Sequence, residues 1–232
     1  MRIQKDDSGL LEHIFEFFVD MAEGEKLREI TPSTGNPKEL WVYREITSIA
    51  KKKNINPIPK FYVASASEGR HTIPGATALK IDKGKHSPSA VLVSEGLLKE
   101  GTKPEITATL EHELTHIERG HLDKVIGMQE QGLLHDNISS AELHKMNSLR
   151  RRWELEADEG VSNPKALVSI IKKGKSSLHE QIKEGFRRFG YPEREAEKMA
   201  SGRTASEAHP SHYRRFSKAL TRQREEPEER HK

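Results

Sequence analysis

The residues best suited to chemistry lie in one short stretch, Thr109 to His116, which reads TLEHELTH. Its last five residues have the pattern H-E-x-x-H, with His112 and His116 four positions apart. On an α-helix this spacing puts both imidazoles on one face, where they can bind a single zinc ion. Glu113 follows the first histidine, so its carboxylate is expected beside the metal's water as a general base. The stretch therefore predicts a zinc site that activates water, and two surface histidines are the alternative.

A catalytic zinc site needs a third protein ligand and an open coordination position. The segment WELEAD at 153–158 offers Glu154 and Asp158, which are four apart and share a helix face. We expect Glu154 to bind the metal and Asp158 to support a ligand, because a metal-bound histidine usually donates its second N–H to a carboxylate. An ordinary acidic helix surface is the alternative for this segment.

Composition limits the remaining possibilities. The chain has 232 residues, 32% of them charged, with a net charge of +3, which suits one domain with a mixed-charge surface. It has no cysteine, so histidine and carboxylate must hold any metal. Its densest basic run, 150–152, is interpreted as helix surface, so nucleic-acid binding is not expected. The apolar run at 14–22 is interrupted by two acids and is too short for a signal or a membrane span. We expect a cytoplasmic protein, with export by an unrecognised signal left open.

Apolar periodicity predicts helices that flank a small sheet. The helix that carries the histidines is expected to begin near Pro104, because Thr102 and Glu105 form a good start signal and Ile106, Leu110 and Leu114 give it an apolar face. This order of elements predicts an α+β fold, mostly helical, with a small antiparallel sheet of about three strands. The expected helices are 10–22, 38–53, 104 onward and 140–161, followed by three or four shorter ones ending near 222; the expected strands are 60–66, 75–82 and 89–94.

The two motifs together resemble the zinc metallopeptidase family of HtpX and the CAAX prenyl endopeptidases, gluzincins that also include Oma-type and periplasmic quality-control proteases. HELTH and ELEAD match the H-E-x-x-H and E-x-x-A-D patterns of that family. Three further stretches agree: His121 five residues after the second ligand, SAVLVSEGLL at 89–98, and HPS at 209–211 followed by Arg215. The resemblance covers about 60–217 and implies a zincin-like domain with Glu154 as the third ligand and Asp158 as its support.

The resemblance also suggests roles for residues outside the metal site. His209 is expected to donate a hydrogen bond to the oxyanion, with helix capping or packing as its alternative. Arg215 is expected to hold the last helix through a carboxylate, or to be a solvated charge. His121 is expected to line the cleft or touch substrate. The strand of Ala90, Val91, Leu92, Val93 and Ser94 is expected either to bind substrate by strand addition or to be an internal strand.

These observations predict a zinc-dependent endopeptidase that holds one Zn²⁺ per chain and cleaves an extended protein or peptide, either latent or of a quality-control type. Residues 1–59 are read as a helical segment that is a cap, a propeptide or part of the core, 60–222 as the peptidase domain and 223–232 as a charged disordered tail. The loop at 126–140 is a candidate lid.

Two other functions stay open. One is a non-catalytic zinc-binding member of the family that acts by binding or regulation. The other is a peptidase-like regulator of a DNA-bound repressor, which would need a helix-turn-helix or a basic patch, and neither is evident. Many relatives have membrane helices or a signal peptide, and neither is expected here, so membrane or prenylated substrates are not inferred.

Overall fold

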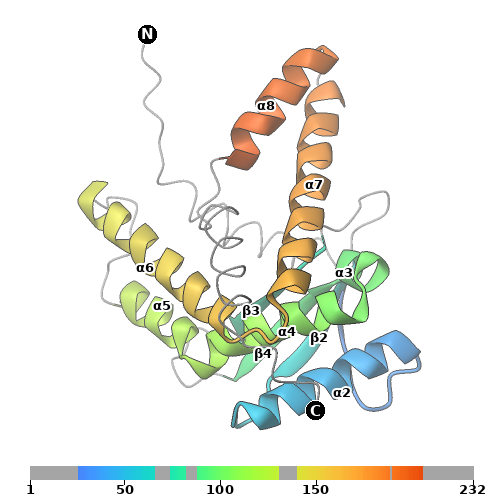
Figure 1. Ribbon diagram of the computed structural model, residues 1–232, viewed down its shortest axis with the longest axis vertical. Helices are drawn as coiled ribbons and strands as arrows, with labels where there is room; N and C mark the ends of the chain where they lie inside the picture. The colour runs from blue at the N-terminus through green and yellow to red at the C-terminus, as the bar shows by residue number, and fades with distance from the viewer. Residues whose placement is uncertain (1–25, 66–73, 82–87, 131–139, 189, 206–232) are drawn as a thin grey trace, which may run out of the picture.

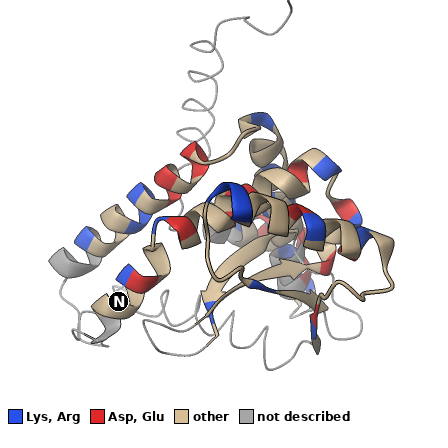
Figure 2. Ribbon diagram, turned by 90° about the horizontal axis from the view of Figure 1, so that it is seen from below, with Lys and Arg blue, Asp and Glu red and all other residues tan. Residues whose placement is uncertain are grey.

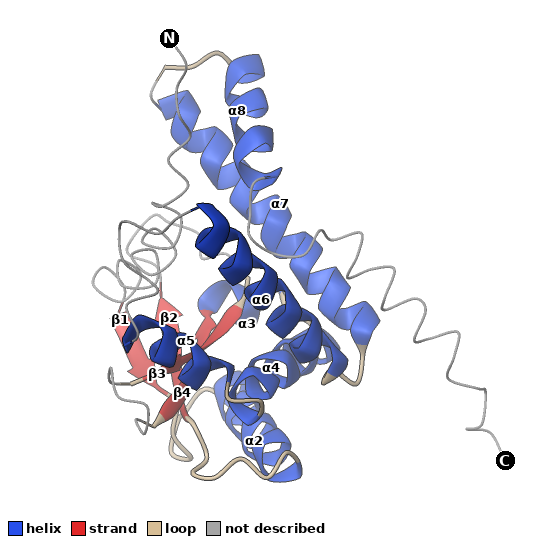
Figure 3. Ribbon diagram, turned by 90° about the vertical axis from the view of Figure 1, so that its left-hand side faces the viewer, coloured by secondary structure: helices blue, strands red, loops and turns tan. Residues whose placement is uncertain are grey.

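The computed structural model describes residues 26–65, 74–81, 88–130, 140–188 and 190–205. These residues form the expected α+β fold, in which the strands make one layer and helices lie against it (Figure 1, Figure 3). The helix expected at 10–22 and the segment that holds His209 and Arg215 lie outside the described residues, as does 131–139 of the candidate lid.

The sheet has four strands rather than three. They are β1 (Lys26–Glu29), β2 (Lys60–Ser65), β3 (Ala76–Lys80) and β4 (Ser89–Ser94), in the order β1-β2-β4-β3. β3 turns back onto β4, so β4 returns alongside β2 in the same direction and this central pair is parallel. The two outer pairs are antiparallel. The sheet is therefore mixed, and the expectation of a wholly antiparallel sheet was wrong.

The extra strand, β1, lies between the helices expected at 10–22 and 38–53, where no strand was predicted. It pairs with β2, and Arg28 at its centre forms an ion pair with the buried Glu39 of α2 (Pro37–Lys52). Ile30, directly after the strand, is 2% exposed and belongs to the main core. Residues 26–52 therefore pack in the same core as the rest of the domain.

The predicted helices near 38–53, 104 and 140–161 are confirmed as α2, α4 and α6. After them the described residues form one helix of 25 residues and one of 13, so the first of the later helices is longer than expected, and the end expected near 222 lies outside the described residues. The described helices beyond α2 are α3 (Glu95–Glu100), α4 (Lys103–Glu118), α5 (His121–Glu130), α6 (Ser140–Glu159), α7 (Pro164–Arg188) and α8 (Glu193–Ala205).

Helix α4 is at the centre of the fold and contacts α2, α5, α6, α7 and β3. Its apolar face is fully buried: Ile106, Leu110 and Leu114 are each 0% exposed. Burying aliphatic side chains of this size stabilises the fold by about 1.5–3 kcal/mol each. The opposite side of the same helix carries the two histidines, so core packing fixes where they point.

Helices α7 and α8 form a hairpin that extends away from the sheet (Figure 1, Figure 3). Ion pairs from Lys183 to Glu193 and Glu197 connect the two helices. In the view of Figure 2, basic and acidic positions are interspersed along the helices. Among the described residues, no helix is long and apolar enough to cross a membrane.

Candidate metal centre

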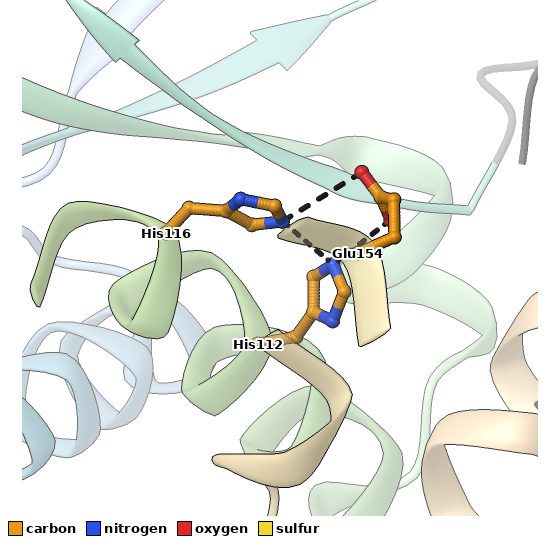
Figure 4. A group of neighbouring side chains, drawn as sticks. All are labelled: His112, His116 and Glu154. Atoms are coloured by element: carbon orange, nitrogen blue, oxygen red, sulfur yellow. Dashed lines mark hydrogen bonds and ion pairs between the residues drawn. The ribbon is translucent and has the colours of Figure 1, made fainter. Parts of the chain in front are cut away.

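Three side chains from two helices converge on one point. His112 and His116 lie one turn apart on α4, and Glu154 reaches them from α6 (Figure 4). The Nε2 atoms of the histidines are 3.1 Å apart, and the Glu154 carboxylate oxygens lie 3.4 Å from His112 Nε2 and 3.7 Å from His116 Nε2. His112 is buried and the other two are half-buried, so the cluster lies at the edge of the core.

These distances fit a tetrahedral zinc ion. Ligand atoms about 2.0–2.1 Å from a tetrahedral ion are about 3.3–3.4 Å from one another. The histidine nitrogens are 3.1 Å apart, Glu154 Oε2 lies 3.4 Å from His112 and Glu154 Oε1 lies 3.7 Å from His116, and single ligand atoms of the three residues lie within 4.8 Å of one another. Two imidazoles and one carboxylate are also the donor set of a catalytic rather than a structural zinc site, because they leave a fourth position open.

A second acid from α6 supports His112 from behind. Asp158 Oδ1 lies 2.9 Å from His112 Nδ1, on the side of the ring opposite Glu154. Burial lowers the pKa of His112, but its contacts with Asp158 and Glu154 outweigh burial and raise that pKa to about 10. With one proton held between Asp158 and the ring at Nδ1, loss of the second proton from Nε2 would free the Nε2 lone pair for a metal. The expected division of labour between Glu154 and Asp158 therefore agrees with the geometry.

His116 behaves in the opposite way. Burial and the neighbouring positive His112 lower its pKa to about 3, so its ring stays neutral. Without a metal, the pair holds one added proton and holds it on His112. A metal ion that took the Nε2 atoms of both rings would displace that proton.

The Glu113 carboxylate is held by the sheet. Its Oε2 accepts a hydrogen bond of 2.7 Å from the backbone N–H of Ala78, in the middle of β3. At the two ends of β3, Gly75 accepts a hydrogen bond from Ser94 and Ile81 donates one to Pro88, so the backbone groups of Gly75 and Ile81 point toward β4. Because this direction alternates from residue to residue along a strand, the backbone groups of Ala78 point away from β4. The general-base candidate therefore lies at the β3 edge of the described sheet.

This arrangement corrects the expectation for the strand of residues 90–94. β4 pairs with β2 on one side and with β3 on the other, so its backbone cannot accept an added strand. Val91 and Val93 are 0% exposed and belong to the core. The alternative of an internal strand holds for Ala90, Val91, Leu92, Val93 and Ser94, and β3 is the outer strand on this side.

Small residues bring α6 close to α4. Ala157 is 0% exposed, and a Cβ added at Gly160 would lie 2.1 Å from Thr115 Oγ1. Thr115 stands between the two histidine ligands in sequence, so this close contact lies directly behind the metal centre. Only glycine fits at position 160 while α6 keeps its position.

The third histidine lies behind the ligands rather than in a cleft. His121 is 1% exposed, and its Nδ1 lies 3.0 Å from His116 Nδ1. Its other nitrogen lies 3.1 Å from Glu156, and its ring stacks on Trp153 at 5.6 Å. The contact of Glu156 with His121 was not predicted from the sequence, because a residue two positions after Glu154 on a helix points away from the proposed metal site. It also missed the bond from Ala78, for which no sequence signal exists.

Comparison with known proteins adds one finding. Residues 36–139 match the model of peptidase family M48. The matched segment spans β2, β3, β4 and α4, with both histidines and Glu113, and it ends before α6; the structure supplies Glu154 from beyond it. No curated protein matches the chain. Over these residues the chain is similar to peptidase family M48, and the His112–His116–Glu154 cluster lies where a zinc site would need its ligands.

Proposed function

We propose that this protein is a zinc-dependent endopeptidase in which His112, His116 and Glu154 hold one zinc ion and Glu113 is the general base. The observation that carries the proposal is the combination of a three-ligand cluster with a carboxylate beside it that is not a ligand. A structural zinc site would instead use a fourth protein side chain.

The chemistry follows from the positions of these groups. When bound, zinc supplies a Lewis acid that acidifies a water molecule and polarises a peptide carbonyl. Glu113 takes a proton from the attacking water, and the hydrogen bond from the Ala78 N–H fixes the position of its carboxylate. Glu113 then gives the proton to the leaving amine. Asp158 holds His112 in the tautomer that binds through Nε2.

The substrate is proposed to bind as an extended strand along β3. In the described sheet β3 pairs only with β4, so the backbone groups of Ala76, Ala78 and Lys80 face outward. The N–H of Ala78 is already used by Glu113, which puts any peptide on this edge beside the general base. Main-chain pairing would bind many sequences, which suits an enzyme acting on unfolded protein.

A non-catalytic zinc protein is the competing function. It would need the three ligands but not Glu113, and it would not need an open edge strand next to the metal. Both features are present, which favours the enzyme.

The test compares wild type with Glu113→Gln on labelled unfolded casein, with bound zinc measured in both. We expect equal zinc in the two proteins, cleavage by wild type that a chelator stops, and cleavage lowered by about 10²–10⁴-fold in the variant. Equal cleavage by both proteins would exclude Glu113 as the base. Zinc bound in both without cleavage by either would favour the non-catalytic alternative.

A further inference from the structure

The buried His121 has no place in the proposed reaction, although it lies next to a metal ligand. It follows Gly120, which adopts a positive φ of 62°. This left-handed residue ends α4 and starts α5 at His121, so the chain turns back on itself. A continued helix would carry position 121 away from the face of the ligands. The turn at Gly120 instead returns the His121 ring to His116.

His121 lies in an unbroken line of polar contacts that begins at the metal site. The line runs from His116 Nδ1 to His121 Nδ1 at 3.0 Å, and from His121 Nε2 to Glu156 Oε2 at 3.1 Å. Arg152 donates to the other oxygen of Glu156 at 2.9 Å. Stacking of the ring on Trp153, with 17° between the planes, fixes its orientation.

The proton positions along this line follow from the chemistry of its far end. Ionised Glu156 only accepts hydrogen bonds, so His121 must donate to it from Nε2. A neutral imidazole that donates from Nε2 carries its lone pair on Nδ1, so His121 accepts at Nδ1, the atom that faces His116 at 3.0 Å. The donor to that lone pair is His116 Nδ1–H, which leaves the Nε2 lone pair of His116 for the metal.

We propose that His121 and Glu156 are positioning residues that fix the tautomer and orientation of His116 and thereby raise the affinity of the site for zinc. The inference rests on the proposed zinc site. Each histidine ligand then has its own carboxylate: Asp158 acts directly on His112, and Glu156 acts on His116 through His121. Loss of such outer contacts typically lowers metal affinity about 10–100-fold.

Two substitutions at position 121 separate hydrogen bonding from packing. His121→Phe keeps a ring that can stack on Trp153 but has no acceptor for His116. His121→Asn keeps an acceptor oxygen near the place of Nδ1. Zinc affinity, measured by competition with a chromophoric chelator, is expected to fall about 10–100-fold in His121→Phe and to be largely retained in His121→Asn.

Glu156→Gln tests the far end of the line without changing the packing around Trp153. It is expected to weaken zinc binding in the same direction as His121→Phe. The matched control is Glu118→Gln, an exposed acid of α4 that pairs with Lys53, and its affinity should equal that of wild type. Imidazole ¹⁵N NMR of the metal-free proteins reads the tautomer directly: wild-type His116 should carry its proton on Nδ1.

The outcomes separate this inference from the proposed function. Wild type that binds zinc together with a folded His121→Phe of equal affinity would overturn the inference alone, as would a wild-type His116 protonated on Nε2. Wild type that binds no zinc would overturn the proposed function, and this inference with it. A fall in affinity for both His121→Phe and Glu156→Gln, with recovery in His121→Asn, is the expected result.

Discussion

Glu105 should make a pH-dependent contribution to the stability of the fold. It is 5% exposed and accepts hydrogen bonds from three directions: the Thr102 N–H at 2.8 Å, Ser169 Oγ at 2.7 Å and Lys173 Nζ at 2.8 Å. The first bond caps the start of α4, and the other two join α4 to α7. The perturbation is Glu105→Gln, which keeps the shape and removes the charge.

The magnitude follows from the pKa of Glu105. Burial alone raises this pKa, but the bonds from Lys173, Thr102 and Ser169 outweigh burial and lower it to about 2, from 4.5. A shift of this size corresponds to about 3 kcal/mol at neutral pH, as an upper value, because the partly exposed Lys173 is screened by water. Because the pKa of Glu105 is lower in the folded protein than in the unfolded chain, its ionised form stabilises the fold at pH values above the unfolded-state pKa of 4.5. This contribution is lost as the pH falls from 4.5 towards about 2.

The assay is urea unfolding of wild type and Glu105→Gln across this range, with a chelator present so that metal loss does not contribute. The difference in unfolding free energy should be about 2–3 kcal/mol near neutral pH and about half of that near pH 3. Glu180→Gln, an exposed acid of α7, is the control and should show almost no difference at either pH. A Glu105→Gln difference that does not change with pH would refute the reasoning.

Three further predictions concern the metal centre. Gly160→Ala should destabilise the fold by about 1–3 kcal/mol in urea unfolding, because its Cβ would overlap Thr115; a neutral result would mean that α6 can shift freely. Asp158→Asn should weaken zinc binding about 10–100-fold in chelator competition, because His112 loses its carboxylate; equal affinity would contradict that role. Zinc at about 100 times its Kd should stabilise wild type by about 2.7 kcal/mol, and a melting temperature that does not respond to zinc would contradict a site formed only in the folded protein.

The helix that carries the candidate metal ligands His112 and His116 could be predicted from the sequence because several local signals agreed. Thr102, Pro104 and Glu105 mark the start of α4, and Ile106 and Leu110 define its buried face. The remaining face then had to carry the H-E-x-x-H histidines. Glu154 could be placed on a second helix by the same reasoning, and the two helices meet as expected.

The sheet was harder to predict because its pairing depends on contacts distant in sequence. KLRE at 26–29 has no apolar alternation, and the strand forms because Arg28 reaches Glu39 and Ile30 enters the core. The run SAVLVS does carry a usable signal. Its near-continuous apolar residues are typical of a strand covered on both faces, which suits the internal position observed for β4.

The role of His121 could not be read from spacing alone. On a continuous helix, the position five residues after His116 lies away from the face that carries His112 and His116. The positive φ of Gly120 ends the helix first and brings the ring back to the site. Glycine in the preceding position was the one available signal.

The central claim is that His112, His116 and Glu154 together hold one zinc ion, and elemental analysis combined with zinc-edge X-ray absorption tests it most directly. We predict one zinc per chain, with a spectrum that contains two imidazole nitrogens at about 2.0–2.1 Å and oxygen ligands at about 2.0–2.2 Å. Glu154→Ala should lower the bound zinc and change the oxygen shell. If the protein holds no zinc after it is loaded with zinc and the excess is removed by dialysis, or if the bound zinc has no imidazole ligands, the central claim is contradicted.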